Sequence, residues 1–113
     1  ELSSDRKGEE SSIIRDRVNA ARQMQLDRFK DEKGIFCNAH MESRDIRRFC
    51  PIDDQAQSLL AMAINKQGLS ARAYDRILKV ARTIADIAAS ETIETGHVAE
   101  AIHYRTLDRH LWL

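Results

Sequence analysis

Residues 68–87 constrain the fold more than any other part of the chain, because they combine a helix end with the start of a long helix. Gly68 can adopt the left-handed conformation that ends many helices. Ser70 can accept a hydrogen bond from a backbone amide in the first turn that follows. Apolar residues then recur at helical spacing: Ala73, Ile77, Val80, Ala81, Ile84, Ile87 and Ala88. This pattern predicts a long helix packed in a core, with alanines that let a neighbouring helix approach closely.

The region before residue 52 predicts one long helix, one loop and one short helix. Residues 12–30 predict an amphipathic helix, and Ser11 or Ser12 can cap its start. Apolar or long side chains recur about one turn apart at Ile14, Val18, Ala21 and Gln25. Residues 31–41 break this periodicity, so we expect the longest loop there. Residues 43–50 predict a short helix, which must end before Pro51 because the residue before a proline avoids helical geometry.

Two more helices complete the predicted domain. Asp53 is placed to cap a helix that ends at Gly68, and a last helix is predicted from Thr95. Only four glycines and one proline occur in 113 residues, which disfavours an all-β fold rich in tight turns. We therefore predict an all-α fold, a small bundle of four main helices plus one short helix. The domain is expected to span residues 11–113, and residues 1–10 to form a linker or a disordered N-terminal end.

The charge and hydropathy of the chain exclude several broad classes of protein. Its 18 basic and 18 acidic residues balance to a net charge of zero, so there is no overall attraction to nucleic acid or to an anionic membrane. No apolar run approaches the about 20 residues that span a bilayer, and no signal-peptide pattern opens the chain. We expect a cytoplasmic protein without a membrane partner. Because the chain begins with Glu1, we also expect it to be part of a longer protein.

The cysteines and histidines give no clear sign of a metal site. Cys37 and Cys50 are expected to be reduced thiols. Cys37 and His40 have a spacing found in zinc sites, but a zinc site needs three or four ligands and the sequence offers no matching second half. No glycine-rich phosphate loop and no nucleophile–histidine arrangement occurs either. We therefore predict neither a metal site nor an independent active site.

Four separated segments resemble one known family. They are residues 68–87, residues 10–22, the Asn-Ala-His triplet at 38–40 and residues 97–105 (His-Val-Ala-Glu-Ala-Ile-His-Tyr-Arg). In this order they resemble the C-terminal domain of the magnesium-chelatase-related AAA+ ATPases, in the branch of the competence protein ComM. The resemblance covers residues 10–108, which is nearly the whole chain.

The resemblance implies a helical lid that follows the ATP-binding core of an AAA+ subunit. Such subunits form rings, usually hexamers, with ATP bound between neighbours. In the family, the lid presents the sensor 2 arginine to the nucleotide, and here that residue is Arg72. ATP and Mg²⁺ are therefore expected cofactors of the full-length parent, and none is expected on this fragment alone. The parent is expected to hydrolyse ATP, and the fragment is not.

Two neighbours of Arg72 are further candidates for ATP binding. Arg76 lies one helical turn along the same face, where it can reach the nucleotide or a neighbouring subunit. The alternative for Arg76 is an ion pair with a carboxylate such as Asp75 or Asp86. Tyr74 is a candidate for the adenine side of the nucleotide, and the alternative is a half-buried tyrosine of the bundle. Arg82 is predicted to be structural.

The expected partners are the upstream core domain, neighbouring subunits of a homo-oligomeric ring, and DNA through the parent. The resemblance links the ComM branch to DNA branch migration during natural transformation. The alternative role for the parent is that of a magnesium chelatase subunit, which inserts magnesium into protoporphyrin.

Two functions of other classes remain open from the sequence. The helices joined by Gly68, Leu69 and Ser70 resemble a helix-turn-helix in connection length, which suggests a small DNA-binding module. The tail at residues 111–113 (Leu-Trp-Leu) suggests a subunit-docking bundle. Some arginines could follow DNA phosphates, but the acidic residues that balance them favour a solvated surface. These arginines are Arg15, Arg17, Arg22, Arg47 and Arg48.

Overall fold

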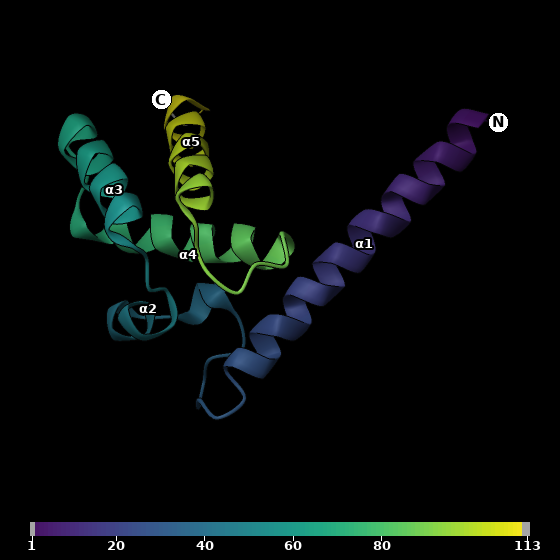
Figure 1. Ribbon diagram of the computed structural model, residues 1–113, viewed down its shortest axis with the longest axis horizontal. Helices are drawn as coiled ribbons and strands as arrows, with labels where there is room; N and C mark the ends of the chain where they lie inside the picture. The colour runs from purple at the N-terminus through teal and green to yellow at the C-terminus, as the bar shows by residue number, and fades with distance from the viewer. Residues whose placement is uncertain (1, 112–113) are drawn as a thin grey trace.

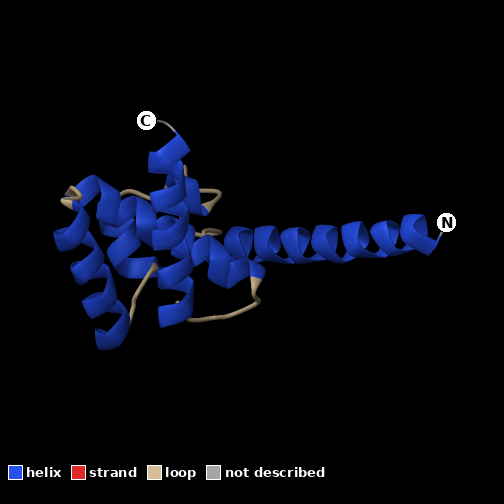
Figure 2. Cartoon of the chain, turned by 90° about the horizontal axis from the view of Figure 1, so that it is seen from above, coloured by secondary structure: helices blue, strands red, loops and turns tan. Residues whose placement is uncertain are grey.

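The computed structural model describes the backbone of residues 2–111 and the side chains of residues 11–105. The elements are α1 (Leu2–Arg28), the 3₁₀ turn η1 (Asn38–His40), α2 (Ser43–Phe49), α3 (Asp54–Gln67), α4 (Ala71–Ile87) and α5 (Thr95–Leu111). The described backbone contains helices and loops and no strand (Figure 2). This confirms the predicted all-α fold of four main helices and one short helix. The residues 111–113 proposed as a docking tail have side chains outside the described part.

The boundaries between α3 and α4 are those that the sequence predicts. The Asp53 carboxylate accepts a hydrogen bond from the Ala56 amide (2.8 Å) and caps α3. Gly68 ends α3 in the left-handed conformation, with φ of 64°. The Ser70 hydroxyl accepts from the Ala73 amide (3.3 Å) and caps α4. Local side-chain chemistry alone therefore fixes this helix–turn–helix connection.

Replacement of Gly68 by alanine tests the left-handed turn. We expect Gly68→Ala to lower the free energy of unfolding by about 1 kcal/mol, because a Cβ is disfavoured at positive φ even where it meets no other atom. Gly96→Ala is the matched control, since Gly96 also has open space around it but lies in α5 without a positive φ. That variant should be neutral or slightly stabilising. Urea unfolding of both variants measures the difference, and equal effects would contradict the turn.

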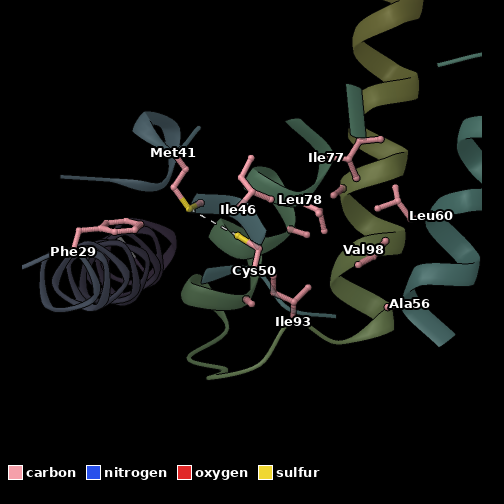
Figure 3. Packing of buried hydrophobic residues seen from close by; sticks show 13 residues of the cluster. Phe29, Met41, Ile46, Cys50, Ala56, Leu60, Ile77, Leu78, Ile93 and Val98 are labelled. Carbon is pink, nitrogen blue, oxygen red and sulfur yellow. Dashed lines mark hydrogen bonds between the residues drawn. The ribbon is translucent and has the colours of Figure 1, made fainter. Parts of the chain in front are cut away.

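α4 is the central helix of the bundle. It contacts α1, α2, α5 and η1, and α3 packs against α5. In Figure 1, α4 lies horizontally with α3 and α5 above it and α2 below it. The core between these helices is almost entirely aliphatic, with one aromatic ring from Phe29. Figure 3 shows its main members: Phe29, Met41, Ile46, Cys50, Ala56, Leu60, Ile77, Leu78, Ile93 and Val98.

α1 differs most from its prediction. It begins at Leu2 and not near residue 12, so the predicted helix start is wrong. Residues 2–11 contain several charged residues with good helix propensity and no proline, and the single Gly8 weakens the helix without ending it. Whether residues 1–10 also act as a linker stays a prediction.

The N-terminal part of α1 extends away from the other helices (Figures 1 and 2). Residues 11–20 are all exposed, and the first buried side chain is that of Ala21. Ile14 and Val18, which the sequence places on the same face as Ala21, are 59% and 39% exposed. The apolar stripe of α1 therefore continues past the end of the core.

Within residues 2–111, no helix is long and apolar enough to cross a membrane.

Candidate functional site

Arg72 lies in the first turn of α4, and its side chain is exposed. It forms no hydrogen bond or ion pair with any residue from 11 to 105. A cation at this end of a helix is mildly disfavoured by the helix dipole. The next residue, Ala73, is buried, so the backbone that carries Arg72 is anchored in the core. α4 thus presents an unpaired guanidinium to solvent from a fixed position.

Arg76 is also exposed, and the structure places it one turn after Arg72 on the same face of α4. The ion pair considered for it, with Asp75 or Asp86, is wrong for both partners. Asp75 accepts a hydrogen bond from the Ser43 hydroxyl (2.6 Å), which joins the start of α2 to α4. Asp86 is bound by other arginines, described below. Like Arg72, Arg76 has no ion pair within the part of the chain whose side chains are described.

Tyr74 lies between these arginines in the sequence but not in space. Its side chain is half-buried and packs against the core cluster. Residues two positions apart on a helix point in nearly opposite directions, so Tyr74 faces away from Arg72 and Arg76. The structure therefore brings the two arginines together and leaves the tyrosine on the other side of α4. The assignment of Tyr74 to ATP binding stays a prediction.

The sequence did not reveal a buried charged cluster at the other end of α4. Asp86 is 1% exposed and binds two arginines. Arg28 at the end of α1 donates to both of its carboxylate oxygens, at 2.6 and 3.0 Å. Arg82, one turn earlier on α4, donates from Nε at 3.2 Å. These three residues, together with Asn38, are called the Asp86 cluster below.

Asn38 connects this cluster to η1 and α1. Its side-chain amide donates to Asp86 (2.9 Å) and to the Thr83 hydroxyl (3.1 Å), and its carbonyl oxygen accepts from Arg28 (3.0 Å). Its backbone amide donates to the Gln25 side chain (2.8 Å). Only an amide side chain offers both donors and an acceptor in this space. The Asn-Ala-His triplet at 38–40 was the one sequence signal for this position, because it belongs to the resemblance.

Arg82 joins the cluster to the connection between α4 and α5. It donates to the backbone carbonyls of Ser90 (2.8 Å) and Glu91 (3.0 Å). Burial lowers the pKa of Arg82, Asp86 opposes this effect, and the nearby Arg28 adds to it. The predicted structural role of Arg82 is confirmed, because its bonds join Asp86 on α4 to the backbone of the connection that follows α4. The Asp86 cluster therefore holds α1, η1 and the connection between α4 and α5 against α4.

The two thiols are free and lie in different environments. Cys50 is buried in the core with Sγ 3.9 Å from the sulfur of Met41 (Figure 3), and Cys37 is half-buried. Burial raises the pKa of Cys50 to about 11. Among the side chains of residues 11–105, no three His, Cys, Asp or Glu groups lie close enough to hold a metal ion. His40 instead accepts a hydrogen bond from the Phe36 amide (3.2 Å).

These environments predict unequal thiol reactivity. At pH 8 we expect a disulfide reagent to label Cys37 in the folded protein and Cys50 at least about 100-fold more slowly, because only the thiolate reacts. The raised pKa also makes the stability of the fold depend on pH. The contribution of Cys50 to the free energy of unfolding is complete below about pH 9, the ordinary pKa of the thiol, and is lost as the pH rises through about 11. Cys37→Ser and Cys50→Ser identify the two reactions. Equal labelling rates in the native state would contradict the burial of Cys50.

The chain is similar to one known family and to several known proteins. Residues 8–105 match the family described as magnesium chelatase, subunit ChlI C-terminal. The chain is 42% identical over 103 residues to the competence protein ComM of Haemophilus influenzae. The matched region covers 91% of this chain and 19% of that protein. It is 43% identical over 102 residues to the uncharacterized protein YifB of Escherichia coli, and this match covers 90% of the chain and 19% of that protein.

The chain thus spans only 19% of the length of these curated relatives. No solved structure matches it. The family match covers most of the chain and includes α4, the buried cluster around Asp86 and the exposed arginines. The chain therefore belongs to the family of magnesium chelatase ChlI-type C-terminal domains, among the members that resemble ComM and YifB.

Proposed function

We propose that this domain is the lid of an AAA+ ATPase and that Arg72 is its sensor 2 arginine. The observation that carries the proposal is the exposed guanidinium of Arg72, which has no partner among the described side chains, at the start of the helix that contacts α1, α2, α5 and η1. A guanidinium is always charged and donates in a planar fork that suits phosphate oxygens. ATP with Mg²⁺ would be bound by the parent protein, between this lid and the core domain.

The role of Arg72 would be electrostatic. A cation placed at the γ-phosphate stabilises the charge that develops during phosphoryl transfer and favours the ATP-bound arrangement. Arg76 shares the face of Arg72 and is proposed to assist in binding the nucleotide, directly or from the neighbouring subunit of a ring. Tyr74 is proposed for the adenine side, which would require the nucleotide to reach the opposite face of α4.

For the parent, we propose a DNA-remodelling ATPase that works as a homo-oligomeric, hexameric ring. The support is the 42% identity to a protein named for competence. A magnesium chelatase subunit is the alternative for the parent, supported by the description of the matching family. For the isolated domain, a DNA-reading role has less support, because α4, the second helix of the predicted helix-turn-helix, is packed against α1, α2, α5 and η1.

The experiment that tests the proposal is ATP hydrolysis by the full-length parent, unchanged and with Arg72→Ala. Loss of hydrolysis in a folded variant supports the sensor 2 role. The isolated chain should not hydrolyse ATP at all, and measurable turnover by it would contradict the assignment as a lid.

A further inference from the structure

A hollow between α4 and α5 has an unusual lining. Its volume is about 170 Å³, and its walls are formed by Arg76, Ile77, Val80, Ala101, Tyr104 and Arg105. Two of these residues are arginines, one from each helix, and none is acidic. Three are aliphatic and exclude water from one side of the hollow. Charge in such a place interacts more strongly than on an open surface.

Arg105 is the residue that makes this hollow informative. Its side chain is half-buried, and its Nε atom is buried without a hydrogen-bond partner. Within residues 11–105 it is the one buried side-chain nitrogen or oxygen in that condition. A buried donor without an acceptor is costly, more so when the group is charged, and native proteins leave few of them. The position therefore requires a partner that the described part of the chain does not provide.

Arg76 adds a second positive charge to the same hollow. It lies on α4, opposite the α5 residues, and it also has no carboxylate partner within the described side chains. On α5, the Glu100 carboxylate accepts a hydrogen bond from the Tyr104 hydroxyl (3.5 Å). The side chain of Asp108, one turn after Arg105, lies outside the described part. Two guanidinium groups without a carboxylate partner among the described side chains repel each other across this hollow. An anion between them would turn that repulsion into attraction and would satisfy the Nε of Arg105.

We propose that the hollow between Arg76 and Arg105 is a binding site for one oxyanion group, a carboxylate or a phosphate. Each guanidinium can donate to oxygen in a fork, and the aliphatic walls keep the bond partly out of water. The volume of about 170 Å³ is large enough for a group of this kind. The site is defined by Arg105 and the hollow, so it does not depend on the sensor 2 role of Arg72.

The test is a titration of the 113-residue chain, followed by NMR of the arginine Nε–H groups and of the Ile77 and Ala101 amides. The probes are inorganic phosphate, acetate and ATP, added at constant ionic strength. We expect a saturable shift of the Arg105 Nε–H signal with at least one probe. In Arg76→Gln and in Arg105→Gln, the Kd read from the amides should be at least tenfold weaker.

Arg44→Gln is the matched control, because Arg44 is an exposed arginine on α2 outside the hollow. Its Kd should equal that of the unchanged chain. If Arg105→Gln does not fold, Arg76→Gln still decides, since Arg76 is exposed and its replacement leaves the core intact.

The three probes distinguish the source of the anion. Tighter binding of phosphate or ATP than of acetate supports a phosphate ligand. Binding of acetate as tight as that of phosphate supports a carboxylate from another protein segment. The absence of a saturable shift with all three probes, or an unchanged Kd in Arg76→Gln, would overturn the proposal. None of these measurements uses ATP hydrolysis. The anion site can therefore be contradicted while the role of Arg72 stands, and the role of Arg72 can be contradicted while the anion site stands.

Discussion

Replacing Asp86 by alanine is expected to lower the free energy of unfolding by about 3–5 kcal/mol, a large part of the stability of a small domain. The side chain of Asp86 is fully buried, and it is the common partner of Arg28 and Arg82, whose side chains are 15% and 3% exposed. Without the carboxylate, two neighbouring guanidinium groups remain in the core with no counter-charge. The penalty arises from these unpaired charges more than from the lost hydrogen bonds.

The control for this prediction is another aspartate on the same helix. Asp75 makes one hydrogen bond, to Ser43, at a more exposed place. We expect Asp75→Ala to lower the free energy of unfolding by about 1 kcal/mol or less. Urea unfolding monitored by circular dichroism measures both variants.

A further variant separates the charge from the shape. Asp86→Asn keeps the volume and removes the charge, so its effect should approach that of Asp86→Ala if unpaired charge is the cause. If Asp86→Ala were no more destabilising than Asp75→Ala, the Asp86 cluster would not hold the bundle together.

The fold was predictable from the sequence where short-range chemistry decides it. The cap of α3 at Asp53, its end at Gly68 and the cap of α4 at Ser70 each involve residues within one turn. Such signals act in the chain before any tertiary contact exists. The all-α class follows from them and from the scarcity of glycine and proline.

The Asp86 cluster was not predictable, because its partners are far apart in the chain. Arg28 and Asp86 are separated by 58 residues, and Arg82 and Asp86 resemble an ordinary surface pair one turn apart. The buried face of α4 is therefore rotated from the face that the apolar pattern predicts, toward the side that carries Arg82 and Asp86. Val80 and Ile87, which the apolar pattern predicts to be buried, are 40% and 42% exposed.

The candidate site was predictable only in part, because it too depends on contacts between helices that the sequence does not show. Arg72 and Arg76 lie on the side of α4 that this rotation exposes, and the resemblance pointed to both. The resemblance covers Arg105 but assigned it no role. Its importance depends on an unsatisfied atom in the contact between α4 and α5, and no sequence pattern reports that contact.

The largest expected effect on activity is that of Arg72→Ala in the full-length parent. We expect kcat for ATP hydrolysis to fall by about 100-fold or more, since removal of one group that stabilises the transition state costs about that much. Arg72 is exposed and has no partner within the described side chains, so its removal should leave the thermal unfolding temperature unchanged. The loss would then belong to the chemistry and not to folding.

Two companion variants give this result its meaning. Arg72→Lys keeps the charge but loses the planar fork, so it should recover part of kcat if charge dominates and little of it if geometry does. Arg44→Ala removes another exposed arginine, from α2, and should leave kcat and KM unchanged. A rise in KM with kcat preserved in Arg72→Ala would mean that the residue binds nucleotide equally in the ground and transition states. Unchanged hydrolysis would remove Arg72 from the proposed site, and the role of the exposed side of α4 would then have to lie in contacts other than catalysis.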